Sequence, residues 1–114
     1  MASFSVFVNS AEPTDTIDKV TREDIASFMS LLGENFHVEN TNKTKLGGDN
    51  GTEANQMTSN YITTGGEKIK SLDIVAIKDG TFYRLTFTIP ADAFNTYLPT
   101  VKKMIDSFRI TGST

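Results

Sequence analysis

The sequence has no cysteine and no tryptophan, and His37 is the only histidine among its 114 residues. Without cysteine the chain can form no disulfide, no thiolate metal site and no cysteine nucleophile. No apolar run approaches the ~20 residues that a transmembrane helix needs, and no signal-peptide pattern opens the chain. We therefore expect no transmembrane segment in these residues, although an export or anchor segment removed from the N-terminus is compatible with them.

Positive charge is also scarce. The chain has 11 Lys and Arg residues against 14 Asp and Glu residues, which gives a net charge of −3. Nucleic-acid-binding domains usually have a strongly basic surface, so we exclude a nucleic-acid partner. Hydrophobic residues make up 38% and charged residues 22%, a balance typical of a folded chain. The length suits a single domain over residues 1–114 with a core of its own.

The stretch 66–110 predicts a strand, a tight turn, a strand and a helix. Asp79 and Gly80 lie between two runs rich in β-branched and aromatic residues, and such a pair suits a two-residue turn with positive φ. With that turn Lys78 pairs with Thr81, and the alternation of side chains fixes the faces of both strands. One face is apolar throughout and consists of Leu72, Ile74, Ala76, Tyr83, Leu85, Phe87 and Ile89.

The other face of this hairpin changes from apolar to polar along its length. Near the turn it carries Val75, Ile77 and Phe82, and further away it carries Ser71, Asp73, Arg84, Thr86 and Thr88. On this face Asp73 lies opposite Thr86, with Arg84 as a diagonal neighbour.

Two interpretations of the polar residues remain open. In the first, Asp73 and Arg84 form an ion pair at the end of the sheet, worth less than about 1 kcal/mol if exposed. In the second, Asp73, Arg84, Thr86 and Thr88 line a polar recess between the sheet and the first helix, where Arg84 holds an anionic group. These four residues are the candidate ligand or partner face.

The C-terminal segment predicts an amphipathic helix. Its apolar residues recur at spacings of three and four, as Phe94, Tyr97, Leu98, Val101, Ile105 and Phe108. Proline costs roughly 3 kcal/mol inside a helix but is tolerated in the first turn. Because of Pro99 we predict a short turn over residues 91–97 and the main helix over 99–107. We expect Phe94, Val101, Ile105 and Phe108 to be buried on the apolar face of the hairpin.

The first helix is predicted over residues 22–32. Thr21 and Asp24 have the spacing of a capping box, and Gly33 suits the C-cap. The apolar stripe of this helix consists of Ile25, Phe28, Met29 and Leu32.

Three further strands complete the predicted sheet. Residues 4–8 place Phe4, Val6 and Val8 on one face and Phe7 on the other, so this strand should be buried, and no lysine or proline within it blocks a free edge. Residues 36–46 and 52–64 flank an Asn50-Gly51 turn and predict a polar hairpin at an exposed edge of the sheet. The order is β-α-β-β-β-β-α, an α+β fold with helices packed on an antiparallel sheet.

The segment after Gly66 resembles the C-terminal part of a PsbP-type domain. The resemblance rests on the Asp79-Gly80 turn, Phe-Tyr-Arg-Leu-Thr-Phe-Thr at 82–88, Pro90, Phe94, Tyr97-Leu98-Pro99 and the Ser107-Phe108 pair. It implies an α-β-α sandwich, shared with the Ran-binding Mog-type proteins, in a bacterial or archaeal member of unknown role. The family's usual N-terminal hairpin, with a tryptophan near a Tyr-Pro pair, is missing here.

This resemblance also carries functional expectations. Well-known PsbP proteins are extrinsic subunits on the lumenal side of photosystem II, where they help retain calcium and chloride near the manganese cluster. Other members are exported or lipid-anchored proteins of unknown role. The resemblance implies an extracytoplasmic or membrane-anchored protein with no catalytic activity and no cofactor.

Other polar groups have structural explanations. His37 has no partner at a catalytic spacing and is expected to be an exposed residue of an edge strand. Asp49-Asn50-Gly51 with Glu53 lacks the ligand pattern of an EF-hand, so a turn explains it better than a calcium site. The acids near the first helix complement the helix dipole; they are Asp15, Asp18, Glu23 and Asp24. We predict no bound transition metal.

Two hypotheses from different classes follow. The first is a non-enzymatic extracytoplasmic binding module that recognises a protein partner through the sheet surface, with residues 4–8 offering an edge for a partner or for self-association. The alternative is a small hydrolase or isomerase that uses Asp73 as acid and base. The alternative requires an acid with a raised pKa in a cleft.

Overall fold

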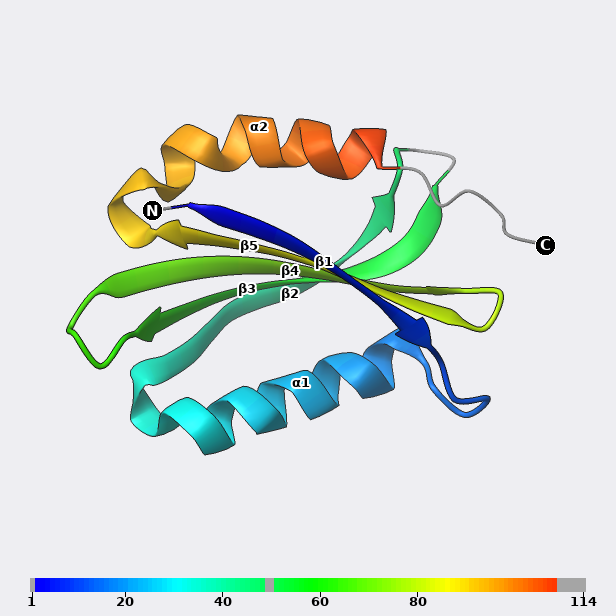
Figure 1. Cartoon of the computed structure of the whole chain (residues 1–114), viewed down its shortest axis with the longest axis horizontal. Coiled ribbons are helices and arrows are strands. Elements are labelled where there is room, and N and C mark those ends of the chain that lie inside the picture. Colours follow the sequence, from blue (N-terminus) through cyan, green and yellow to red (C-terminus); the bar gives the residue numbers. More distant parts are fainter. Residues whose placement is uncertain (1, 49–50, 109–114) are drawn as a thin grey trace.

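The structure is a computed structural model that describes residues 2–48 and 51–108. A five-stranded antiparallel sheet separates two helices, one on each face (Figure 1). The elements are β1 (Ser3–Ser10), α1 (Ile17–Leu32), β2 (Phe36–Leu46), β3 (Thr52–Ile62), β4 (Lys68–Lys78), β5 (Thr81–Pro90) and α2 (Phe94–Ser107). Short 3₁₀ turns, Gly33–Asn35 and Ala91–Ala93, precede β2 and α2. The predicted α+β class and element order are confirmed.

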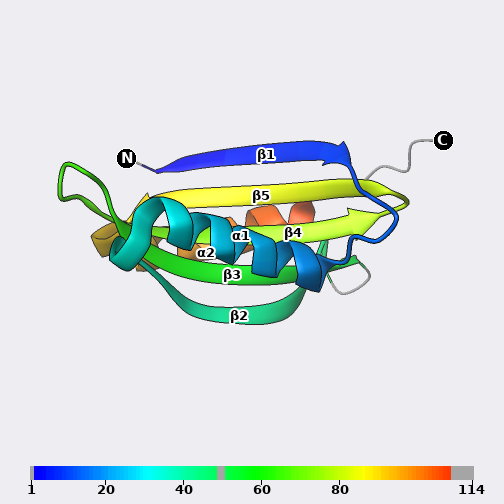
Figure 2. The same ribbon diagram turned by 90° about the horizontal axis from the view of Figure 1, so that it is seen from below.

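The strands lie in the order β1-β5-β4-β3-β2, so β1 and β2 form the two edges (Figure 2). The N-terminal strand therefore joins the sheet beside the C-terminal hairpin. In the same view α1 lies over the central strands and leaves β1 uncovered. The position of α1 decides which side chains of the sheet are shielded from water.

The turn between β4 and β5 has the predicted geometry. Asp79 has φ 52° and Gly80 has φ 76°, the two positive values that a type I′ turn needs. Lys78 pairs with Thr81, and the register continues along both strands as predicted. The hairpin thus presents the two faces that the alternation of its sequence indicates.

Each helix packs on one of these faces. On the α2 side the buried core combines the predicted apolar face with the helix, and Ile74 and Leu85 are completely buried there. On the α1 side a smaller core of Val20, Val75 and Phe82 lies at the turn end of the hairpin. The apolar part of the second face is therefore covered by the N-terminal half of α1.

The start of α1 differs from the prediction. The helix begins at Ile17, and Thr16 is its N-cap, with Oγ1 accepting from the Lys19 backbone N–H at 3.1 Å. Thr21 is instead buried inside the helix, where its hydroxyl donates to the Ile17 carbonyl at 2.7 Å. The capping-box assignment was wrong because Thr16 offers the same cap one turn earlier. Gly33 is the C-cap as predicted, with φ 59°.

The apolar stripe predicted for α1 is only partly correct. Ile25, Phe28 and Leu32 are half-buried, but Met29 is 55% exposed. The face turned to the sheet is rotated toward Val20 and Thr21, because a helix that starts one turn earlier buries residues of that first turn.

The predicted break at Pro99 does not occur. α2 runs without interruption from Phe94 to Ser107, and Pro99 lies inside it on the exposed side. Proline removes one backbone hydrogen bond, but buried residues on both sides of it hold the helix on the sheet. Phe94, Val101 and Ile105 are buried as predicted, whereas Phe108 is only half-buried at the C-cap.

β1 is an edge strand, as predicted, but it is not buried. Phe4 is 42% exposed, Val6 44%, Phe7 49% and Val8 55%. One side pairs with β5, and the Phe4 ring stacks on Phe87 with centroids 4.5 Å apart. The prediction of burial was wrong because neither helix extends over this edge.

The β2–β3 hairpin is confirmed, with β2 at the edge and His37 exposed on it. β3 is more central than its polar sequence suggested, since it pairs with both β2 and β4. Asp49 and Asn50 lie outside the described ranges, so the predicted Asn50-Gly51 turn stays a prediction.

Ile105→Ala should destabilise the protein by about 2–5 kcal/mol, because Ile105 is 5% exposed in the core under α2. Urea unfolding followed by circular dichroism measures this change in the free energy of unfolding. Met104→Ala is the matched control on the same helix, since Met104 is 36% exposed, and its cost should stay near 0.5 kcal/mol. Equal costs for the two variants would contradict the packing of α2.

Candidate functional site

Ligand pockets usually have volumes of about 300–1,000 Å³, and a cavity of ≈ 530 Å³ lies between the C-terminal half of α1 and the sheet. We call it the α1 recess. Its lining comprises Ser5, Phe7, Phe28, Leu31, Leu32, Phe36, Ser59, Tyr61, Ser71, Asp73, Arg84, Thr86 and Thr88. All four residues of the predicted ligand face line it. The predicted recess between the sheet and the first helix is therefore present.

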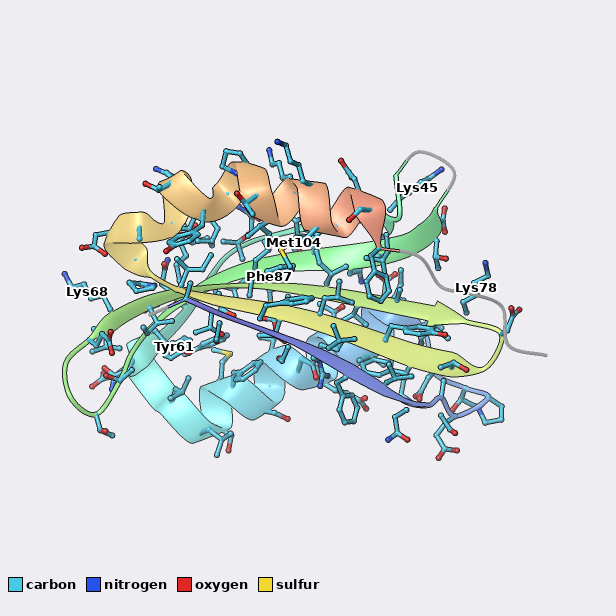
Figure 3. All side chains as sticks on the ribbon, turned by 45° about the horizontal axis from the view of Figure 1, so that its top comes forward. Lys45, Tyr61, Lys68, Lys78, Phe87 and Met104 are labelled. Carbon is cyan, nitrogen blue, oxygen red and sulfur yellow. The ribbon has the colours of Figure 1, made fainter. Side chains whose placement is uncertain are left out.

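The floor of the α1 recess is rich in hydroxyl groups because three neighbouring strands turn polar residues to the same face. Ser59 of β3 pairs with Ser71 of β4, and Ser71 pairs with Thr88 of β5. Tyr61 also belongs to the lining and lies between the sheet and the C-terminal half of α1 in Figure 3. Hydroxyls can donate and accept, so this floor can adapt to different polar groups.

Asp73 lies at the centre of this floor and is only 4% exposed. Its Oδ1 accepts from Thr86 Oγ1 at 2.8 Å, and its Oδ2 accepts from Ser71 Oγ at 3.3 Å. Burial raises the pKa of Asp73, and these two hydrogen bonds with the charge of Arg84 only partly oppose the rise. Among the residues that the structure describes, no lysine or arginine forms an ion pair with Asp73.

Arg84 pairs with Asp24 of α1 and not with Asp73. Its Nη2 donates to Asp24 Oδ1 at 2.6 Å and to Oδ2 at 2.7 Å. The guanidinium also lies near the rings of Phe82 and Phe7, at 5.0 and 5.9 Å from their centroids. The expected Asp73–Arg84 ion pair is absent from this geometry. The sequence pattern assigned Asp24 to a helix cap, so its role in fixing Arg84 was missed.

Apolar side chains form the wall of the α1 recess. Phe28 of α1 stacks on Phe36 of β2 with centroids 5.4 Å apart, and Phe36 is 4% exposed. Leu31 stands at the mouth and is 81% exposed. Phe36 was read as the start of a polar strand, but a register shift between Val38 and Asn40 lets the first residues of β2 face α1. A register shift of this kind leaves no clear signal in the sequence.

Two of the remaining acids near the first helix, Asp15 and Asp18, form structural contacts. Asp18 accepts from Asn55 Nδ2 at 2.9 Å and pairs with Lys43, which ties the start of α1 to β2 and β3. Asp15 pairs with Lys19 one turn along. Across residues 2–48 and 51–108, no group of three His, Asp or Glu side chains is placed to hold a metal ion.

His37 does not belong to the α1 recess. It lines a separate hollow at the end of the sheet, beside Lys68 and Ala91. The acid of the α1 recess thus has hydroxyl neighbours but no imidazole. This arrangement can bind a small ligand, because its floor has a buried carboxylate and hydroxyl groups and its wall has aromatic and aliphatic surface.

Within the described part of the chain, neither helix is long and apolar enough to cross a membrane.

The sequence matches no protein family model and no curated protein. Solved structures, however, share its fold. PA94 from Pseudomonas aeruginosa, a protein of unknown function, matches with a TM-score of 0.83 at 11% identity, over 98% of this chain and 74% of its own. CyanoP, the cyanobacterial PsbP from Synechocystis, matches with a TM-score of 0.75 at 11% identity, over 96% of this chain and 68% of its own.

A third similar structure is LpqN, a protein involved in cell envelope biogenesis of Mycobacterium tuberculosis. It matches with a TM-score of 0.53 at 16% identity, over 94% of this chain and 61% of its own. Identities this low establish the fold and not the activity. The architecture implied by the sequence resemblance is nevertheless confirmed: this chain has the PsbP-like fold, a five-stranded antiparallel sheet between two helices.

Proposed function

We propose that this protein is a non-catalytic binding module and that the α1 recess is its ligand site. The observation that carries the proposal is the buried carboxylate of Asp73, which faces a cavity of ≈ 530 Å³ without a cationic partner. Burying a charge without a partner costs stability, so such a group is most useful when a ligand completes its environment.

The catalytic alternative has less support. Asp73 meets the requirement of a raised pKa in a cleft. General acid and base catalysis also needs a second group positioned on the reacting atoms. The groups within hydrogen-bonding distance of Asp73 are the Thr86 and Ser71 hydroxyls, which hold the carboxylate but supply no base for a nucleophile. Binding is therefore the function that the geometry supports best.

We also propose an extracytoplasmic location. LpqN, which shares the fold, is involved in cell envelope biogenesis. An envelope protein of this size can act by carrying a small ligand or by contacting a partner, and neither role needs a transmembrane helix. Fractionation of cells with an antibody against this chain tests the location.

A second candidate function is association through the β1 edge. β2, the other edge, carries Lys43 and Lys45 and a register shift, which are features that block pairing with another strand. β1 has no charged residue, and both of its faces carry exposed apolar side chains. We propose that a second copy pairs here in antiparallel fashion, with Val6 opposite its own symmetry mate and Phe4 opposite Val8.

Blocking the α1 recess should abolish ligand binding without loss of the fold. Ser5 is exposed on β1 and lines the recess, so Ser5→Trp should fill its rim. The probes are octanol, octanoate and octylammonium, and the readout is the shift of backbone amide NMR signals. At least one probe should shift signals of the recess lining in the wild type and none in Ser5→Trp. Val6→Trp, on the other face of the same strand, is the control and should retain binding.

The site would be refuted if none of the three probes bound to the wild type. It would also be refuted if the probes shifted only amide signals outside the recess lining.

Asp73→Asn should raise the free energy of unfolding at neutral pH. Burial raises the pKa of Asp73, so the folded protein binds this proton more tightly than the unfolded chain does. The resulting stabilisation is present in acid and is lost as pH rises through the folded pKa. The facing groups Arg84, Asp24 and Tyr61 are common to both proteins, so the difference between variant and wild type should grow from acid to neutral pH.

Urea unfolding at a series of pH values measures this difference. Asp92→Asn, at an exposed acid in the turn before α2, removes the same charge away from the recess and is the matched control. A wild type that matches or exceeds the stability of Asp73→Asn at neutral pH would show that the carboxylate is not strained by burial.

Val6→Lys should weaken self-association through β1, because a lysine at the centre of the pairing places two like charges opposite each other. Sedimentation equilibrium over a range of protein concentrations measures the dissociation constant. Thr41→Lys on the β2 edge is the matched control and should leave association unchanged. A wild type that remains monomeric at every concentration reached would exclude this second function.

A further inference from the structure

The charges around the α1 recess do not cancel. Arg84 and Asp24 neutralise each other through two short contacts, 2.6 and 2.7 Å. The other charged group on the recess lining is Asp73, which has no ion pair. Tyr61 on the β3 side is neutral in its ordinary form. With Asp73 ionised, the recess has a net charge of −1 at its floor, so it attracts a positive group and repels a negative one.

The hydrogen bonds of Asp73 lead to the same conclusion. An ionised carboxylate has about four acceptor positions. Thr86 and Ser71 each fill one, and Ser71 does so at the long distance of 3.3 Å. A ligand that donates hydrogen bonds can use the remaining acceptor positions. An ammonium group has three N–H donors and combines this capacity with the charge that the carboxylate lacks.

The apolar wall of the recess favours a ligand that carries an organic group next to its charged group. Phe28 and Phe36 present stacked aromatic rings, and Leu32 and the exposed Leu31 continue the apolar surface to the mouth. An inorganic cation would leave this apolar surface exposed to water. An alkyl or aryl group would bury it and gain about 25 cal/mol for each Å² of apolar area removed from water.

An anionic ligand fits less well. Its natural partner is Arg84, but that guanidinium is already held by the Asp24 carboxylate and lies near the rings of Phe7 and Phe82. An anion would have to displace Asp24 and then lie close to Asp73. The geometry therefore favours a cationic ligand over the anionic group that the sequence pattern suggested for Arg84.

We infer that the α1 recess binds a small organic cation, a primary or secondary amine on an apolar body, with the ammonium on Asp73 and the body along Phe28 and Phe36. The inference rests on the proposed function of the recess and adds the chemical class of its ligand. In this arrangement the ammonium group binds the Asp73 carboxylate, which the Ser71 and Thr86 hydroxyls hold in place, and the apolar body packs on the aromatic wall.

Isothermal titration calorimetry at neutral pH tests the class, with amide NMR shifts to locate the bound probe. The probes share an eight-carbon chain and differ in the head: octylammonium, octyltrimethylammonium, octanol and octanoate. Octylammonium should bind at least about tenfold more tightly than octanol and octanoate. It should also bind more tightly than octyltrimethylammonium, which has the charge but no N–H donor.

Asp73→Asn should remove the preference, so that octylammonium binds no better than octanol, while the amide spectrum shows that the fold is kept. Asp92→Asn changes the net charge equally and should leave the preference intact.

If octanol binds in the recess as tightly as octylammonium, the recess is a binding site but this inference is wrong. If octanoate binds most tightly, the ligand is an anion and Arg84 receives it. If no probe binds in the recess, the proposed function fails as well.

Discussion

The burial of β4 on both faces is the constraint on which the rest of the structure depends. Six consecutive residues, from Ser71 to Ala76, are buried, and this strand pairs on both sides with full register. Its even-numbered residues form the core with α2, and its odd-numbered residues face α1. Because the period of a strand is two, a shift of one residue would exchange the two faces and put Asp73 into the α2 core. The type I′ turn at Asp79-Gly80 prevents that shift by fixing where β5 begins.

Local signals in the sequence predicted this half of the fold well. The turn residues, the alternation of 68–89 and the stripe of 94–105 depend on neighbours along the chain, so they can be read without tertiary information. The break expected at Pro99 does not occur because the packing of α2 on the sheet outweighs the local rule. Thr21 is not the N-cap because Thr16 supplies an equivalent cap earlier in the chain, so two local signals competed there. The exposure of Phe4 and Val8 likewise depends on where the helices lie, which no pattern within β1 encodes.

The sequence predicted the polar residues on the floor of the candidate site but not the side chains that form its walls. Asp73, Arg84, Thr86 and Thr88 share a face because of strand alternation, and the structure brings them to one recess. The partner of Arg84 was not predictable, since Asp24 lies 60 positions earlier in the chain and on a helix whose rotation was misjudged. That one contact changes the electrostatic character of the recess. The sequence pattern left open an Asp73–Arg84 ion pair or an anion held by Arg84, whereas the Asp24 contact leaves the Asp73 carboxylate as the unbalanced charge.

Phe7 belongs to two surfaces at once. It is half exposed on the free edge of β1, and it also lines the α1 recess next to Arg84. A strand docked on β1 and a molecule bound in the recess, as proposed, would therefore both contact this one ring. Thermodynamic linkage requires that such an effect be reciprocal: whatever factor a bound ligand imposes on edge pairing, edge pairing imposes on the ligand. If both proposals hold, Phe7 would couple the occupancy of the recess to pairing at the β1 edge.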